Sequence, residues 1–226
     1  MKKNEIGFFY VVATPIGNME DISNRAIRIL KEVNLILCEN FNHSIKLLKY
    51  FQINTELKTL YSNSSENRFE WVIKLLEEGK DLALICDSGT PGISDPGSAI
   101  VRNLRKLDYN IIPIPGASAL STMLSISGCQ VNPTVFLGFL SEKESKKIKE
   151  LEKYKEFSGL IVLYESVHRI IKTLKLIMEI FPESEIMIGR ELTKSHEEMI
   201  VINPGEISKL ESIILKGEFV VLINNI

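Results

Sequence analysis

Three loops rich in glycine, proline and serine are the segments of this sequence best suited to bind a ligand. They are residues 13–18, 87–97 and 113–119, and each follows a short apolar segment that is typical of a strand. In an open α/β sheet, ligands bind in the crevice outside the carboxyl ends of the strands. Three such loops at one edge therefore predict a pocket lined largely by main-chain N–H and C=O groups, although each loop alone is also compatible with a tight turn.

The composition of these loops favours a ligand without phosphates. Neither a GxGxxG nor a GxxxxGK[ST] arrangement occurs in the sequence, so the usual glycine-rich phosphate-binding loops are absent. S-adenosylmethionine suits the pattern, because main-chain groups can hydrogen-bond its adenine and amino-acid ends and a helix N-terminus can receive its carboxylate. The loops therefore predict a methyl-transfer site.

Four side chains at or near expected strand ends are candidates for a proton acceptor at such a site: Glu39, Glu165, Glu191 and Lys194. In-line methyl transfer needs mainly alignment of the reacting atoms, and a base can assist it. Alternative roles remain open for all four residues. Glu39 and Glu165 could cap helices or bind nearby main chain, and Glu191 and Lys194 could form an ordinary ion pair.

Apolar segments alternate with amphipathic ones from the first residues to about residue 128, which predicts a mostly parallel sheet with helices on both faces. The expected strands are 8–13, 35–38, 58–61, 81–86 and 110–114, and the expected helices are 23–31, 44–51, 67–78, 97–107 and 117–127. Gly, Asn and Pro in residues 128–134 interrupt both patterns and predict a linker. The expected domains are therefore 1–128 and 129–226.

The second domain should also be α/β, with a mixed sheet. Its expected strands are 135–139, 159–164, 185–191, 196–202 and 218–223, and its expected helices are 141–157, 167–180 with Ser166 as the cap, and 204–215. The short stretch 193–195 between two of the strands predicts an antiparallel hairpin. Lysine and glutamate alternate through 141–157, which is typical of a solvent-exposed helical face.

The overall composition limits the classes of function. The chain has 226 residues, 45% of them hydrophobic, and a formal net charge of −2, which argues against a protein that binds polyanions through a general coat of cations. No apolar run approaches the roughly 20 residues of a membrane span, and the N-terminal segment lacks a secretory cleavage pattern, so we expect a cytoplasmic protein. Three scattered histidines and three separated cysteines predict neither a metal site nor a disulfide framework.

Seven sequence blocks occur in the order and spacing of a known family. They are VATPIGNMEDISNRA (12–26), DSGTPGISDPG (87–97), PIPGASAL (113–120), GFL (138–140), YESVHR (164–169), RELTK (190–194) and GEFVV (217–221). Together they resemble the ribosomal RNA small subunit methyltransferase I family of the tetrapyrrole methylase superfamily. The resemblance covers essentially the whole chain.

The resemblance implies two α/β domains with S-adenosylmethionine in the cleft between them, in a homodimer. It also implies 2′-O-methylation of a cytidine in small-subunit ribosomal RNA, either as free RNA or in the assembled subunit. Carried over by position, the cofactor residues are Pro15, Ile16, Asp87, Ser88, Gly89, Thr90, Ile93, Ser94, Ser118, Ala119 and Tyr164. Because Glu191 and Lys194 belong to a retained block, they are the catalytic candidates that we favour at the acceptor site.

The sequence departs from the family pattern on the acceptor side. Where the family usually has Glu-Asp-Thr-Arg after the second strand, this chain has Glu39, Asn40, Phe41 and Asn42. Residues 62–67, with Asn63 and Ser65, replace a segment of the family that contains histidine. Two alternatives therefore stand beside the ribose methyltransferase. One is a methylase of a tetrapyrrole or another macromolecule, and the other is a cofactor-binding protein that has lost its acceptor chemistry.

Overall fold

The computed structural model describes residues 6–60, 66–95, 97–130 and 132–226. The chain divides into two compact units, Met1–Ser118 and Ala119–Ile226. The division falls at 118/119 and not at the predicted 128/129, because the helix that begins at Ala119 packs against the last strand of the second unit. No helix in the described ranges is long and apolar enough to cross a membrane.

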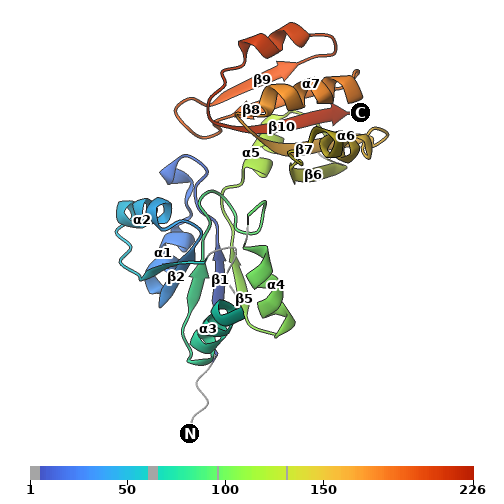
Figure 1. Cartoon of the computed structure of the whole chain (residues 1–226). Helices are drawn as coiled ribbons and strands as arrows, with labels where there is room; N and C mark the ends of the chain where they lie inside the picture. The colour runs from blue at the N-terminus through green and yellow to red at the C-terminus, as the bar shows by residue number, and fades with distance from the viewer. Residues whose placement is uncertain (1–5, 61–65, 96, 131) are drawn as a thin grey trace. The chain divides into compact units, whose positions relative to one another are not determined.

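The first unit contains a five-stranded parallel sheet in the order β3-β2-β4-β1-β5 (Figure 1). Its strands are β1 (Phe9–Val12), β2 (Leu35–Cys38), β3 (Leu57–Thr59), β4 (Leu82–Leu84) and β5 (Ile111–Ile114). Its helices are the 3₁₀ helix η1 (Met19–Asp21), α1 (Asn24–Glu32), α2 (Phe41–Tyr50), α3 (Glu66–Glu77) and α4 (Ser98–Lys106). The predicted strand–helix alternation is confirmed.

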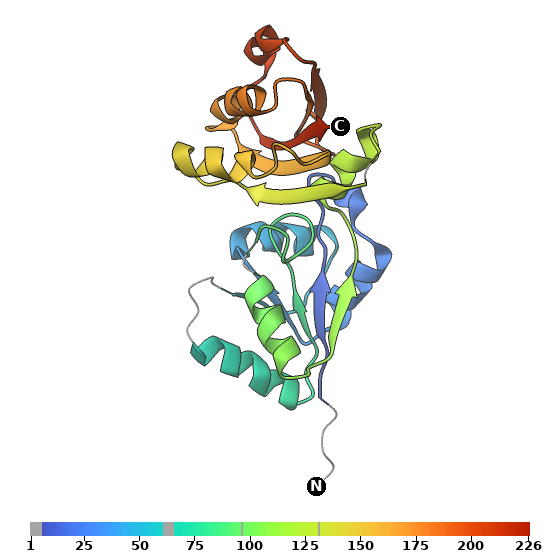
Figure 2. The same ribbon diagram turned by 90° about the vertical axis from the view of Figure 1, so that its right-hand side faces the viewer.

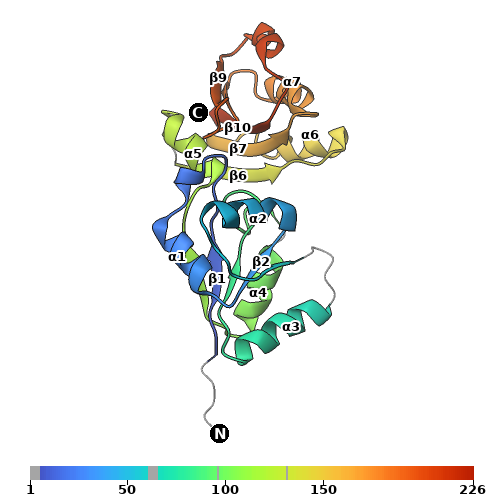
Figure 3. The ribbon, with the colours of Figure 1, turned by 90° about the vertical axis from the view of Figure 1, so that its left-hand side faces the viewer.

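Both faces of this sheet are buried, which explains why its strands read as continuous apolar runs. In β2, Ile36 and Cys38 point to one face and pack with residues of α1 and α2. Figure 3 shows these two helices beside the sheet. Leu35 and Leu37 point to the other face, which α3 and α4 cover (Figure 2). The two-residue period of the strand thus builds two separate cores and fixes the direction in which the loops leave the sheet.

The second unit contains a mixed sheet in the order β6-β7-β10-β8-β9. Its strands are β6 (Thr134–Phe139), β7 (Gly159–Ser166), β8 (Glu185–Arg190), β9 (Glu198–Ile202) and β10 (Glu218–Asn225), and its helices are α5 (Ala119–Ile126), α6 (Glu144–Glu152), α7 (Ile170–Ile180) and the 3₁₀ helix η2 (Ile207–Ser212). β6 and β7 are parallel, and the other neighbouring pairs are antiparallel. The predicted mixed sheet and the β8–β9 hairpin are confirmed.

Several predicted helix limits are wrong, each for a local reason. α2 begins at Phe41 and not at residue 44, because the Asn40 side chain accepts the first main-chain N–H groups of the helix. Ser166 does not cap α7, because it is the last residue of β7. The predicted helix 204–215 is a six-residue 3₁₀ helix, a tighter geometry that is used in short pieces.

The highly charged helix is also shorter than predicted, and its N-terminal flank has a specific contact. Ser141 donates hydrogen bonds from its N–H (2.9 Å) and its Oγ (2.6 Å) to the Glu150 carboxylate. Ser141 therefore lies beside α6 and not within it. This contact places the end of β6 against the helix that follows it.

Candidate functional site

Hydrogen bonds join the parts of the three predicted loops that lie in the first unit into one structure, which we call the loop rim (residues 13–18, 87–95, 97 and 113–118). The Thr14 N–H donates to the Gly89 carbonyl oxygen at 2.8 Å, and the Gly89 N–H donates back to the Pro15 carbonyl oxygen at 3.4 Å. The Thr90 Oγ1 donates to the Ala117 carbonyl oxygen at 3.0 Å. The loops after β1, β4 and β5 therefore meet, as predicted from their positions at strand ends.

Gly89 is required at the centre of the loop rim by its backbone conformation and by the space around it. Its φ is +80°, in the region that L side chains rarely adopt. A Cβ atom at this position would lie 3.2 Å from the Ile16 Cγ2 atom and 3.5 Å from the Ala117 carbonyl oxygen. The glycine thus keeps main chain exposed at the point where the three loops meet.

The second half of the β4 loop is held by one carboxylate. The Asp95 Oδ1 atom accepts hydrogen bonds from the Gly92 N–H (2.7 Å) and from the Gly97 N–H (2.9 Å). Ser94, between them, has a φ of +65°. This arrangement fixes the loop just before α4 begins at Ser98, and Pro96 itself lies outside the described residues.

The loop rim brings most of the predicted cofactor residues of the first unit together. Pro15, Ile16, Gly89 and Thr90 share the contacts just described, and Ile93 donates its N–H to the Thr90 carbonyl oxygen at 3.4 Å. The structure places the remaining residues of this group, Asp87, Ser88, Ser94 and Ser118, in the same three loops. The Asp87 Oδ1 atom is buried and accepts no hydrogen bond from the described residues.

The second unit contains the other two predicted cofactor residues, Ala119 and Tyr164. Ala119 is the first residue of α5, and the Leu120 N–H donates to the Tyr164 hydroxyl at 3.1 Å. The Tyr164 ring packs edge-on against Phe136 and Phe139, with centroids 4.9 and 5.6 Å away. An aromatic ring on β7 is therefore tied to the start of α5 and fixed in orientation by two neighbours.

The two favoured catalytic candidates, Glu191 and Lys194, form an ion pair in the turn between β8 and β9. The Lys194 Nζ lies 2.8 Å from the Glu191 Oε1 and 2.9 Å from the Glu218 Oε2. The Glu191 Oε1 also accepts the Glu218 N–H at 3.0 Å. Gly217 makes this possible, because a Cβ atom there, at a φ of +97°, would overlap the Glu191 carboxylate. The RELTK and GEFVV blocks are thus one structural unit.

The charges in this turn are mutually stabilised. Burial alone would raise the pKa of Glu191, but hydrogen bonds from the Lys194 ammonium and from the Glu218 N–H hold it below its usual range. Burial alone would lower the pKa of Lys194, but hydrogen bonds to Glu191 and Glu218 raise it above its usual value. At neutral pH Lys194 is therefore a cation that cannot accept a proton, and Glu191 is a carboxylate.

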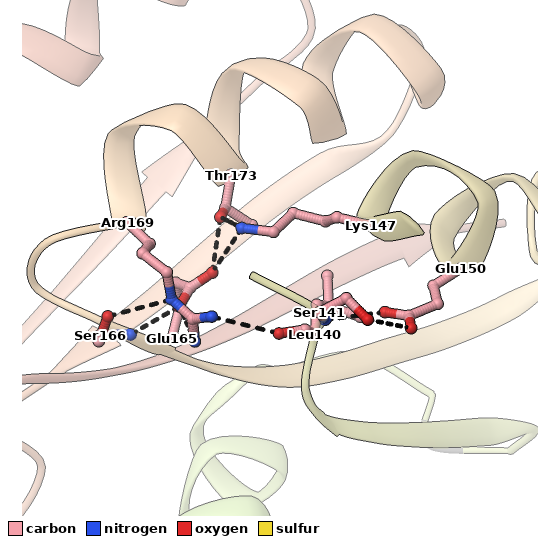
Figure 4. Close-up of polar contacts among 8 residues, drawn as sticks. All are labelled: Leu140, Ser141, Lys147, Glu150, Glu165, Ser166, Arg169 and Thr173. Atoms are coloured by element: carbon pink, nitrogen blue, oxygen red, sulfur yellow. Dashed lines mark hydrogen bonds and ion pairs between the residues drawn. The ribbon is translucent and has the colours of Figure 1, made fainter. Parts of the chain in front are cut away.

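Glu165, the candidate from the YESVHR block, is the centre of a buried cluster (Figure 4). Its Oε2 lies 3.2 Å from the Lys147 Nζ and accepts a hydrogen bond from the Thr173 Oγ1 at 2.6 Å. Its Oε1 lies 2.8 Å from the Arg169 Nη2 and accepts the Ser166 N–H at 2.8 Å. With a relative exposure of 1% and both oxygens engaged, this carboxylate holds α6 and α7 against β7 and is not a proton acceptor for a substrate.

Lys147 corrects a second expectation. The alternation of lysine and glutamate predicts an exposed helix, yet Lys147 has a relative exposure of only 4%, and its Nζ also donates to the Thr173 Oγ1 at 2.6 Å. A buried ammonium requires a partner of opposite charge, and Glu165 supplies it. The pattern of charges in one helix does not show this, because the partner comes from a distant strand.

A cavity of about 120 Å³ lies in the first unit next to the loop rim. Its walls come from the ends of β2 and β4, from the β4 loop and from α3 and α4, and its lining residues include Glu39, Leu60, Phe69, Pro91, Asp95 and Asn103. Burial first, and then the charges of Asp87 and Asp95, raise the pKa of Glu39, and a main-chain hydrogen bond from Asp87 offsets part of this rise. The sequence pointed to Glu39 by its place at a strand end, but contained no signal for Asn103.

The remaining candidates are the residues that replace the family pattern on the acceptor side. Asn63 and Ser65 lie outside the described residues. In the described ranges, no group of three or more His, Cys, Asp or Glu side chains is arranged to hold a metal ion. Asn40 caps α2 through hydrogen bonds from the Asn42 and His43 N–H groups, and Phe41 is exposed. Of these replaced residues, Asn40 therefore has a structural role at the start of α2.

Comparison with known proteins identifies relatives along the whole chain. The family model of Tetrapyrrole (Corrin/Porphyrin) Methylases matches residues 9–208. Ribosomal RNA small subunit methyltransferase I of Leptospira biflexa serovar Patoc is 52% identical over 99% of this chain and 93% of the relative. The protein of the same name from Coprothermobacter proteolyticus is 42% identical over 95% of this chain and 96% of the relative.

Solved structures with the same fold are more distant in sequence. A diphthine synthase superposes with a TM-score of 0.75 and 14% identity, over 96% of this chain and 89% of that one. The methyltransferase CobJ superposes with a TM-score of 0.71 and 17% identity, over 97% of this chain and 94% of that one. At this level of identity the two similarities establish the fold, and the fold supports the predicted architecture.

Proposed function

Because this chain belongs to the ribosomal RNA small subunit methyltransferase I family within the tetrapyrrole methylases, we propose that it transfers a methyl group from S-adenosylmethionine to the 2′-hydroxyl of a cytidine in small-subunit ribosomal RNA. The observation that carries the proposal is the 52% identity with the Leptospira biflexa relative over nearly the full length of both chains. The loop rim agrees with it, since it offers main chain to a ligand without phosphates.

The residues present fit this cofactor. Gly89 leaves main chain accessible at a point where a side chain would intrude, and the buried Asp87 Oδ1 is an acceptor that needs a donor. The residues that we propose to hold the cofactor are Pro15, Ile16, Asp87, Ser88, Gly89, Thr90, Ile93, Ser94 and Ser118 from the first unit and Ala119 and Tyr164 from the second. When bound, S-adenosylmethionine supplies a methyl group that its positive sulfur already activates.

The task left to the protein is to bind and align the acceptor. We assign Lys194 and Glu191 to this task. The Lys194 ammonium pairs with Glu191 and Glu218, and its part-exposed side chain has a third N–H that is suited to donate to an oxygen of the RNA. The Glu191 carboxylate is suited to accept a hydrogen bond from a ribose hydroxyl and to orient it. Since Lys194 stays protonated, it acts as a cation and not as a base.

The partners and the cellular place follow from the same proposal. The acceptor is small-subunit ribosomal RNA, free or in the assembled subunit, and the protein acts as a homodimer in the cytoplasm. The net charge of −2 suggests that RNA is recognised locally and by shape, since the chain lacks an overall excess of cations.

One experiment tests the proposed reaction. The purified protein is incubated with S-adenosylmethionine labelled in its methyl group and with small subunits, or free ribosomal RNA, from a strain that lacks this gene. Nuclease digestion and mass spectrometry then locate the label. We expect one cytidine that is methylated on its ribose. Label on a base or on a tetrapyrrole would refute the ribose assignment, and tight cofactor binding without any transfer would indicate a protein that only binds the cofactor.

A further inference from the structure

The cavity beside the loop rim has mostly apolar walls. Apolar side chains from the β3 end, α3, β4 and α4 line it, including Leu60, Phe69, Leu84 and Ile100, and Pro91 of the β4 loop closes one side. Its volume of about 120 Å³ is several times the space that a single water molecule requires. An apolar pocket of this size with a few polar groups is typical of a site that receives part of a small organic molecule.

The polar groups at this cavity are rich in acceptors. Glu39 and Asp95 line it, and Asp87 lies near enough to raise the pKa of Glu39. In the described ranges, none of these three carboxylates forms an ion pair with a cation of the chain. The site therefore favours a ligand that brings N–H donors.

We propose that this cavity receives the base of the nucleotide whose ribose is methylated, and that the Glu39 carboxyl group accepts a hydrogen bond from the exocyclic amino group of cytosine. The proposal deepens the proposed function and rests on it. It gives the enzyme a residue that selects the base, in addition to residues that bind the cofactor and the ribose.

The chemistry of the base edges explains why Glu39 would distinguish cytidine from uridine. Cytosine presents an amino donor at position 4, and glutamate is a favourable acceptor for it, whereas uracil presents a carbonyl oxygen at the corresponding position. Two oxygens that face each other without a hydrogen between them repel, so the Glu39 carboxylate would disfavour uracil at this position. Unstacked bases in single-stranded RNA are recognised in this way, by their edges and between apolar side chains.

Glu39 also has a suitable place in the fold. It follows β2 directly, so a strand that is buried on both faces fixes its main chain. Figures 1 and 3 show α2, which begins two residues later, near the end of the parallel sheet at which β1 and β4 release their loops. The proposed base pocket and the loop rim therefore belong to the same edge of the first unit.

The test compares Glu39→Gln with a matched control, Glu32→Gln. Glu32 is an exposed carboxylate at the end of α1 that pairs with Arg28 and does not line the cavity. Wild type and both variants are assayed for methyl transfer to RNA fragments that differ only in cytidine or uridine at the target position. The dissociation constant of S-adenosylmethionine is measured for each by calorimetry.

For Glu39→Gln we expect the preference in kcat/KM for cytidine over uridine to fall by on the order of tenfold, since the amide can also donate to the uracil oxygen. Cofactor affinity should stay within about twofold of wild type, and Glu32→Gln should change neither quantity. A second variant, Ala99→Leu, reduces the cavity from the side of α4 and should raise KM for RNA without weakening cofactor binding.

Each other outcome has a definite meaning. An unchanged preference in Glu39→Gln, with normal transfer to cytidine, would overturn the base pocket and leave the proposed function intact. A large loss of cofactor affinity in Glu39→Gln would overturn it as well, because the cavity would then belong to the cofactor. Absence of transfer by the wild-type protein to any RNA would refute the proposed function and, with it, this assignment.

Discussion

Replacing Glu165 by glutamine should destabilise the protein strongly while acting only indirectly on catalysis. Glutamine keeps the size of the side chain but removes its charge. The Lys147 ammonium, which lies 3.2 Å from the carboxylate, would then be buried without an anionic partner, and Arg169 would lose its contact at 2.8 Å. Thr173 and the Ser166 N–H also donate to this carboxylate, so the change affects the polar contacts through which Glu165 joins α6, α7 and β7.

The magnitude follows from the burial of the pair. Removing one partner of a buried ion pair costs about 3–5 kcal/mol, because the other charge stays desolvated. For a chain of this size, each kcal/mol shifts the midpoint of thermal unfolding by about 2–4 °C. The expected fall in Tm for Glu165→Gln is therefore roughly 6–20 °C. The control pair Arg28–Glu32 has the same i,i+4 spacing as Glu165–Arg169 but is more than half exposed, so Glu32→Gln should cost only about 0.3–0.5 kcal/mol.

Thermal unfolding monitored by circular dichroism measures both variants, together with Lys147→Met and the double variant Glu165→Gln/Lys147→Met. The double variant should be less destabilised than the sum of the single ones, since Lys147→Met removes the buried ammonium that Glu165→Gln leaves without an anion, and only Arg169 then lacks its partner. A Glu165→Gln protein with a Tm within about 2 °C of wild type would refute this reasoning. So would a loss of methyl transfer at unchanged stability, which would make Glu165 a candidate proton acceptor again.

Two further predictions concern the loop rim and the β8–β9 turn. Gly89→Ala should weaken S-adenosylmethionine binding by about tenfold in calorimetry, because its Cβ would press on Ile16. The control Gly92→Ala has a similar φ of +89° but open space around it, so it should weaken binding less. Equal effects of the two substitutions would contradict the role of Gly89. The lowered pKa of Glu191 contributes stability that is present above pH 4.5 and is lost as the pH falls through the lowered value. The raised pKa of Lys194 contributes stability that is present below pH 10.5 and is lost as the pH rises through the raised value. Glu191→Gln should therefore lower Tm at neutral pH and make its fall on acidification less steep, and an unchanged acid profile in a pH series would contradict the assignment.

The helices and strands of the first unit are well predicted from the sequence. Packing on the core imposes the two-residue period of strands and the 3.6-residue period of helices, and the prediction depends on both. The predicted limits of β2, Leu35–Cys38, are the observed ones, since a parallel strand buried on both faces must be apolar throughout. Errors occur where a side chain sets the helix end. Asn40 starts α2 earlier than the apolar pattern suggests, and Ser166 looks like a cap while it is the last residue of β7. Both errors depend on whether a side-chain oxygen accepts a hydrogen bond from a free main-chain N–H at the helix start, and residue types alone do not show this.

The candidate site is predictable from the sequence to the extent that it depends on main chain. A glycine with positive φ and a neighbouring proline are visible as residue types, so the sequence alone is enough to place at one edge the three loops that meet at Thr14, Gly89 and Ala117. Side chains that depend on a distant partner leave no such trace. Glu165 and Lys147 are 18 residues apart, and their burial follows from how α6 packs on β7.

The surroundings of a side chain, which the sequence does not show, decide between the glutamate candidates for the acceptor side. Glu39 and Glu165 are equivalent as sequence candidates, because both are glutamates at strand ends, yet the structure separates them by their surroundings. Glu165 has two cations and two further donors, so its charge is satisfied and its function is to hold the unit together. Glu39 has neighbouring carboxylates, a raised pKa, one main-chain donor and a cavity beside it, so part of its hydrogen-bonding capacity remains available. A carboxylate that the fold leaves partly unsatisfied is the one that a substrate can use, and for this reason Glu39 is the first residue to mutate on the acceptor side.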